Sequence, residues 1–128
     1  MGQQQMLLII LGVLVVGFAI AVGIALFSAQ SISSNRDAMI GDLNHLAAIA
    51  YQYRISIRPL GGGEGDYSGF VIPTQMLSNN NGSYTVANAQ KNSITFQAIS
   101  TDNPSNTIVV TIDSNGKTGN FTFGGDFQ

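Results

Sequence analysis

Apolar and polar positions divide the chain into three stretches with different periods. From Met6 to Phe27 every residue is apolar or glycine. From Ile32 to Tyr53 apolar residues recur at every third or fourth place, which is the spacing of one face of a helix. The remaining residues form short β-branched and aromatic segments separated by turn residues, which is typical of strands. The pattern predicts an α+β fold with one long N-terminal helix packed on a small C-terminal antiparallel sheet.

The helix is predicted from about Gln3 to about Ser56, because no proline occurs before Pro59 and no strong turn cluster interrupts it. Its first half would span about 33 Å, enough to cross the apolar core of a bilayer. A helix of on the order of 80 Å exceeds the diameter of a domain of about 70 residues, so that domain should cover the second half only. The predicted apolar stripe of the second half consists of Ile32, Met39, Ile40, Leu43, Leu46, Ala47, Ala50 and Tyr53.

Five strands are predicted after the loop sequence RPLGGGEGD. In 93–100 apolar residues alternate with polar ones, which indicates a sheet with one buried face. Asn115-Gly116 predicts a two-residue type I′ hairpin, because both central residues of that turn take φ > 0. The predicted strands are 67–72, 83–87, 93–100, 107–113 and 117–123.

These elements suggest four segments. Residues 1–2 would be a very short leader, and 3–30 the apolar half of the helix, which serves assembly or membrane insertion. Residues 31–57 would be its amphipathic half, and 58–128 a β-rich outer domain.

Charge is scarce and begins late in the chain. Charged residues make up 9% of the 128 residues, against about one quarter in an average soluble protein. The first is Arg36, the net charge is −2, and the five basic residues are scattered singly. Nucleic acid binding normally needs a clustered basic face, so nucleic acid is not expected as a partner. The chain has no cysteine, which excludes disulfides, thiolate metal sites and thiol nucleophiles.

No motif points to catalysis. His45 is the only histidine, and a general base or metal site would need more partners than Asp42, one turn before it. Gly116-Lys117-Thr118 resembles the end of a phosphate-binding loop, but the earlier glycine is missing and a strand is expected to follow. Glu64 and Asp66 are weak candidates for a cation site. We therefore expect no enzyme activity and no catalytic, cofactor-binding or metal-binding residue.

Two sites match the N-x-[ST] acceptor sequence for N-linked glycans. They are Asn81-Gly82-Ser83 and Asn120-Phe121-Thr122. Chance matches are expected in a domain rich in Asn, Ser and Thr, so both are only possible acceptors.

The apolar N-terminal segment allows four interpretations. A secretory signal peptide usually has a basic start and an apolar core of 7 to 15 residues, and this run is longer. N-myristoylation needs Ser or Thr where the chain has Met6. A single-pass anchor fits the hydropathy, but the flanks lack the Lys/Arg asymmetry and the Trp/Tyr belt of membrane helices. The fourth interpretation is a self-association surface within a polymer.

Small residues favour the polymer. Pairs four places apart, such as Gly17 and Ala21, allow helix backbones to approach closely. Larger side chains between them would interdigitate and exclude water, and their burial would contribute tens of kcal/mol per subunit at about 25 cal/mol per Å². The predicted filament-core residues are Leu7, Leu11, Val15, Gly17, Phe18, Ala21, Val22 and Leu26.

The chain resembles the type IV pilin superfamily. The resemblance rests on a glycine followed by an apolar helix that becomes amphipathic, and then by a small β domain. Gly2-Gln3 looks like the prepilin-peptidase junction of archaeal-type pilins, so the resemblance implies processing there. It also implies a homopolymeric helical filament, a precursor in the cytoplasmic membrane, and an assembly machinery and prepilin peptidase as partners. The expected function is that of the major subunit of an extracellular pilus-like filament.

Two departures from the family pattern carry expectations of their own. Most bacterial members have a glutamate near the fifth mature position, where this chain has Leu7 counted from Gln3, or Gln5 counted from Met1. The glutamines 3–5 are therefore expected to form neutral amide hydrogen bonds in the filament. The apolar helix also lacks the proline of many bacterial members, so it should be continuous. A minor pilin or pseudopilin, or a membrane-anchored β domain that binds a surface partner, remains the alternative.

Overall fold

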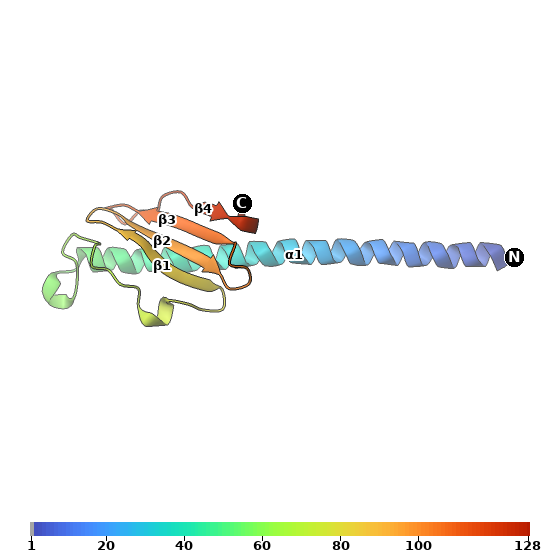
Figure 1. Ribbon diagram of the computed structural model, residues 1–128, viewed down its shortest axis with the longest axis horizontal. Helices are drawn as coiled ribbons and strands as arrows, with labels where there is room; N and C mark the ends of the chain where they lie inside the picture. Colours follow the sequence, from blue (N-terminus) through green and yellow to red (C-terminus); the bar gives the residue numbers. More distant parts are fainter. Residues whose placement is uncertain (1) are drawn as a thin grey trace. The chain divides into compact units, whose positions relative to one another are not determined.

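The computed structural model describes residues 2–128 and has the predicted α+β architecture (Figure 1). Contacts divide the chain into a first unit that ends at Ser33 and a second unit, Ser34–Gln128. The regular elements are α1 (Gly2–Ile55), β1 (Gly82–Ala89), β2 (Ile94–Ser100), β3 (Thr107–Ile112), β4 (Thr122–Gly124) and three short 3-10 helices, Arg58–Leu60, Thr74–Met76 and Gly125–Phe127.

Helix α1 confirms the prediction of one uninterrupted helix from about residue 3 to about residue 56. It has 54 residues and ends at Ile55. The segment that follows closes onto the last turn of the helix: the Gly63 N–H donates to the Tyr53 carbonyl at 2.8 Å, and the Glu64 N–H donates to Ser56 at 2.9 Å. Glu64 takes a positive φ of 55°. The glycine-rich loop is thus an ordered cap that satisfies the final helix carbonyls.

In the second unit, α1 packs on one face of the sheet (Figure 1). Of the predicted apolar stripe, Met39, Leu43, Leu46, Ala47 and Ala50 are buried. The other three members, Ile32, Ile40 and Tyr53, are only half-buried. The sheet contributes side chains that alternate along each strand, since successive residues point to opposite faces. The buried large or apolar side chains of the sheet are Tyr84, Ile94, Phe96, Ala98, Ile108, Val110 and Ile112.

The sheet is antiparallel with the order β1-β2-β3-β4, so each strand pairs with its neighbour in the sequence. A register shift between Val86 and Asn88 marks a bulge in edge strand β1. Such bulges twist an edge and make it a poorer template for pairing with further strands.

The predicted strand 67–72 is wrong: this segment is irregular. Its buried residues, Tyr67, Phe70 and Ile72, are three and two places apart, which does not fit the period of a strand. The Phe70 N–H donates to the Tyr67 carbonyl at 2.9 Å and closes a turn. The Tyr67 hydroxyl donates to the Asp113 carbonyl at 2.7 Å. The segment therefore fills one end of the core without pairing with a strand.

The predicted type I′ hairpin at Asn115-Gly116 is also wrong. Gly116 has φ +79°, but Asn115 is not among the described residues with positive φ. The Asp113 N–H donates to the Lys117 carbonyl at 3.0 Å, and the Gly116 N–H donates to the Asp113 carbonyl at 3.1 Å. This is a three-residue loop with glycine in the left-handed position.

The strand predicted at 117–123 is mostly irregular. Only an isolated bridge between Ile112 and Thr118 precedes β4.

Replacing Leu46 by alanine should destabilise the second unit by about 2 to 5 kcal/mol, because it leaves a cavity in a packed core. Leu46 is 0% exposed, whereas Leu60 is 79% exposed, so Leu60→Ala is the matched control and should cost less than about 0.5 kcal/mol. Urea unfolding of the full chain in detergent, followed by tyrosine fluorescence, measures both changes. Equal losses in the two variants would contradict the assigned core.

Candidate assembly surface

The first unit carries a large apolar surface. Every described residue from 2 to 31 is exposed. The large apolar side chains between Met6 and Phe27 are 53% to 76% exposed. A monomeric soluble protein rarely exposes a contiguous apolar patch of more than a few hundred Å². This surface therefore requires a cover of lipid or protein.

The predicted filament-core residues all belong to this surface. The large ones follow one another at spacings of four and three places, which puts them on one face of α1. Gly17 has open space where a side chain would begin, with no atom within 4 Å. The predicted residues Leu7, Leu11, Val15, Gly17, Phe18, Ala21, Val22 and Leu26 are all exposed.

Helix α1 is also long and apolar enough to cross a membrane. Its most apolar 18-residue window has a mean hydropathy of 3.1 and no buried part. The same property is shared by signal sequences near an N-terminus, so it shows compatibility with a membrane and no more. Gly2 and Gln3, the predicted processing junction, lie in the first turn of the helix.

Hydrogen bonds hold the first part of α1 in the second unit against loops of the sheet. The Asn35 amide donates to the Asn81 carbonyl at 3.0 Å, and its oxygen accepts from the Ser100 hydroxyl at 2.7 Å. Two turns further along α1, the Asp42 carboxylate accepts from the Tyr84 hydroxyl and from the amide of Asn81. Asn79 donates to the same carboxylate at 2.9 Å. These contacts tie α1 to the loops at one end of the sheet.

The environment of Asp42 sets its ionisation. Burial alone would raise the pKa of this carboxyl, but the hydrogen bonds from Tyr84, Asn79 and Asn81 together outweigh burial and hold the pKa below its ordinary value. His45 adds a smaller electrostatic effect in the same direction. Burial first, and then the contact with Asp42, raises the pKa of the Tyr84 hydroxyl. The tyrosine thus stays protonated and the carboxylate ionised at neutral pH.

Arg54 fastens the other end of α1. Its guanidinium donates to the Ser114 carbonyl at 2.8 Å and to the Lys91 carbonyl at 3.4 Å. The same group lies 5.4 Å from the centre of the Tyr67 ring. One side chain therefore connects the end of the helix to the β1–β2 turn and to the loop after β3.

The residues considered as catalytic or metal-binding candidates do not come together in one site among residues 2–128. Among residues 2–128 no three side chains of the kinds that bind metals gather in one place. His45 is exposed on α1, as expected for a polar position on a helix surface. Glu64 lies 3.5 Å from Arg58, so it forms an exposed ion pair.

The two glycan acceptor sequences differ in their surroundings. The Asn81 side chain is half-buried and donates to Asp42 at 3.2 Å. Its backbone carbonyl also accepts from Thr101 at 3.3 Å. Asn120 is exposed in an irregular segment before β4. A glycan on Asn81 would be attached to the half-buried nitrogen that donates to Asp42, whereas one on Asn120 would extend into solvent.

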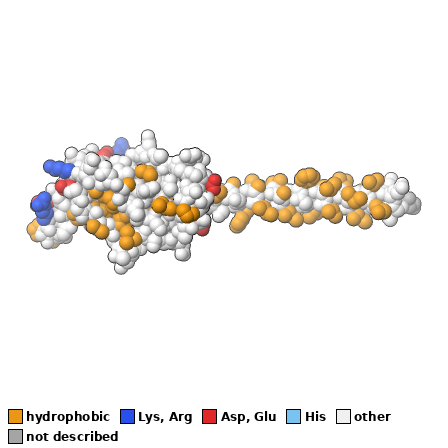
Figure 2. All heavy atoms as spheres, in the orientation of Figure 1, with side chains coloured by type: hydrophobic (Ala, Val, Ile, Leu, Met, Phe, Trp, Pro, Cys, Tyr) orange, Lys and Arg blue, Asp and Glu red, His pale blue; other side chains and the backbone are white. Residues whose placement is uncertain are grey.

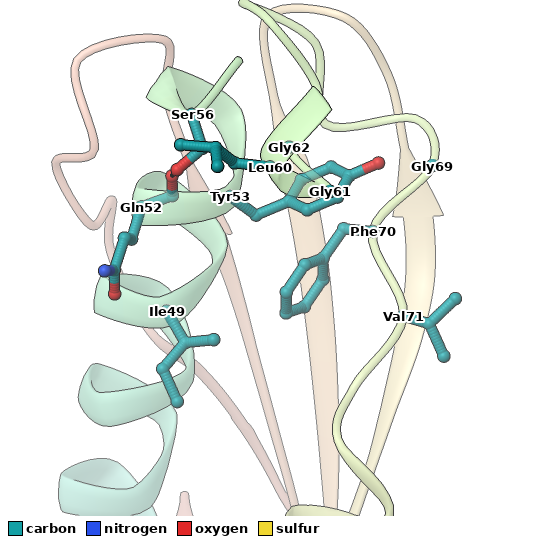
Figure 3. A pocket seen from close by; sticks show the side chains of 10 residues that line it. All are labelled: Ile49, Gln52, Tyr53, Ser56, Leu60, Gly61, Gly62, Gly69, Phe70 and Val71. Carbon is teal, nitrogen blue, oxygen red and sulfur yellow. Dashed lines mark hydrogen bonds between the residues drawn. The ribbon is translucent and has the colours of Figure 1, made fainter. Parts of the chain in front are cut away.

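The structure also has an open pocket of about 440 Å³ between the end of α1 and the segment before β1 (Figure 3). Tyr53 and Phe70 meet edge to face there with ring centres 5.5 Å apart. In Figure 3 Val71 points away from the helix, and it is exposed. No charged side chain lines this pocket, and sequence reasoning did not find it because its walls come together only through the cap after α1. The lining residues are Ile49, Gln52, Tyr53, Ser56, Leu60, Gly61, Gly62, Gly69, Phe70 and Val71.

Comparison with protein-family models, with curated proteins and with solved structures finds no match to this chain. A functional proposal therefore depends on the surfaces described above.

Replacing Asp42 by alanine should destabilise the second unit by about 1 to 3 kcal/mol at pH 7, because the buried Tyr84 hydroxyl loses its acceptor. Asp37→Ala is the control, since Asp37 is exposed. The lowered pKa of Asp42 means that its contribution is present above the unfolded value of 3.8 and is lost as the pH falls through the folded value. Denaturant titrations at pH 7 and pH 3 should therefore show a smaller acid effect in Asp42→Ala than in Asp37→Ala. Equal losses of stability between pH 7 and pH 3 in the two variants would contradict this role of the Asp42 carboxylate.

Proposed function

We propose that this chain is a structural subunit of an extracellular filament of the type IV pilus kind. The observation that supports the proposal is the fully exposed apolar half of α1, joined in one helix to a β unit with its own core. Side-by-side packing of such helices from many copies would bury this surface, and the β units would remain in water. The free energy gained by burying this apolar surface, at about 25 cal/mol per Å², would make the polymer hard to dissociate.

The membrane is the other environment that would cover this surface, and it fits the precursor. A single helix is stable in the bilayer because all its backbone hydrogen bonds are internal. It could therefore leave the lipid and join a bundle of helices without a change of fold. The resemblance to type IV pilins adds processing after Gly2 by a prepilin peptidase and export by an assembly machinery. In this proposal the subunit is abundant, has no enzyme activity and needs no cofactor or nucleic acid.

A single-pass anchor that displays the β unit is the second candidate, and a minor pilin or pseudopilin is a third. The hydropathy of the exposed apolar helix fits a membrane anchor as well as it fits a filament subunit. The face of alternating large and small residues favours the polymer, because a lone helix in lipid has no need of close approach.

Shearing cells that make the protein separates these functions. The filament proposal expects the protein in the sheared supernatant, in fibres visible by electron microscopy and identified by mass spectrometry. Abundance then distinguishes a major from a minor subunit. Protein confined to the membrane pellet would overturn the filament and favour the anchor.

Substitutions in the apolar helix test the packing directly. Ala21→Leu keeps the segment apolar, so membrane insertion should persist, but its bulk should prevent close helix approach and reduce filament yield. Val15→Glu should abolish filaments by burying an unpaired ion. Val15→Leu is the matched control and should assemble. Measurement of the membrane-extractable subunit beside the sheared yield separates failed insertion from failed assembly, and normal filaments from Ala21→Leu and Val15→Glu would argue against a helical core.

A further inference from the structure

The charged side chains of the second unit are sorted between its two ends. One end is the side where α1 enters, near Asn35, and we call it the entry end. Asp42 lies there through its bonds to Asn79 and Asn81. Asp102 follows Ser100, whose hydroxyl contacts Asn35 and accepts from the Asp102 N–H. The acidic residues at the entry end are Asp37, Asp42, Asp102 and Asp126.

Arg36 is the one basic residue at the entry end, and its side chain contacts Phe123 and Asp37. Its guanidinium lies 5.3 Å from the centre of the Phe123 ring, and its Nε is 4.0 Å from the Asp37 carboxylate. A cation over a ring face is attracted to the ring, and the Arg36 side chain is 38% exposed. Asp37, Asp102 and Asp126 are exposed, so carboxylates dominate the entry end.

The opposite end, where α1 finishes, carries four of the five basic residues and has a small excess of positive charge, and we call it the cap end. Arg54 lies there by its contacts to Ser114 and to the carbonyl of Lys91. Lys117 closes the loop after β3. Among residues 2–128, neither Lys91 nor Lys117 takes part in an ion pair. The basic residues at the cap end are Arg54, Arg58, Lys91 and Lys117, against the acidic Glu64, Asp66 and Asp113.

Figure 2 shows one face of the second unit, with the basic side chains gathered at one end, where some acidic ones lie among them, and only acidic ones at the edge of the other end. The surface between the ends is nearly free of charge. The outer face of the sheet, opposite α1, has hydroxyl, amide and aliphatic side chains, including Thr85, Gln97, Val109 and Thr122, which stand in one row across the four strands. Charge therefore marks the ends and leaves the outer face neutral.

We propose that the acidic entry end of one second unit docks on the basic cap end of a second copy of this chain. A two-fold contact through the entry end would bring carboxylates together, and like charges opposed at an interface cost several kcal/mol, so the charges favour a head-to-tail arrangement. Head-to-tail contacts repeat without closing when their rotation does not complete a ring. The inference rests on the proposed filament and adds to it: apolar helices supply adhesion, whereas the charged ends set the direction and spacing of the β units.

Charge reversal at exposed positions tests the contact. Asp102→Lys with Asp126→Lys makes an acid-reversed chain, and Lys91→Glu with Lys117→Glu makes a base-reversed chain. Each should lower the yield of sheared filaments by at least about tenfold near 0.05 M salt, because every contact then opposes like charges. The chain with all four changes has the wild-type net charge and restores complementarity, so its yield should return to within about twofold of wild type. The deficits of the reversed chains should shrink at 1 M salt, where the screening length is about 3 Å.

Co-expression gives a second measurement that does not depend on the fourfold variant. The acid-reversed chain has two basic ends and the base-reversed chain has two acidic ends, so the two should co-assemble although neither assembles alone. Thermal unfolding in detergent confirms that each chain folds. Reversed chains that assemble as well as wild type, or folded chains for which neither the fourfold change nor co-expression restores filaments, would overturn the contact while the filament stands. A wild-type chain that forms no filaments would overturn both.

Discussion

The apolar surface of residues 6–27 is the constraint on which the rest depends. A helix satisfies its backbone hydrogen bonds internally, so this segment needs no partner for its polar groups. Its side chains do need cover, since none is buried within the described chain. At about 25 cal/mol per Å², the free energy of covering them exceeds the total stability of about 5 to 15 kcal/mol of a typical domain. This surface therefore decides where the chain resides, and the β unit has to remain folded in that environment.

The second unit meets this requirement with a small core and polar contacts at both ends of its helix segment. Buried apolar side chains supply most of the stabilisation, but they are non-directional. Asn35 and Asp42 at one end and Arg54 at the other contact loops from distant parts of the sequence. Hydrogen bonds with defined geometry fix the register of α1 against the sheet. A helix that continues into a polymer needs such a register, because rotation of the unit about α1 would move every outward surface.

Periodicity in the sequence was sufficient for the large features. The helix bounds agree with the structure because no proline or strong turn cluster interrupts the segment, and the buried stripe Met39 to Ala50 agrees because it follows from spacing. Spacing failed for 67–72, where Tyr67 and Phe70 are held by a turn and by a hydrogen bond to Asp113. The Asp42 cluster was not predicted, since its partners are 37 to 42 residues away and no local pattern connects them. Exposure of the candidate filament-core residues followed from composition, whereas what covers them lies outside the single chain.

The distribution of charge links the two units. No ionisable side chain precedes Arg36, so the first unit can exchange lipid for protein surroundings without the cost of desolvating an ion. The glutamines at its start keep hydrogen-bonding capacity in either place, because an amide both donates and accepts. All charged residues of the chain occur from Arg36 onward, and they are concentrated at the ends of the second unit. A neutral helix cannot specify direction by electrostatics, so any preference for one orientation of neighbouring copies has to come from that second unit.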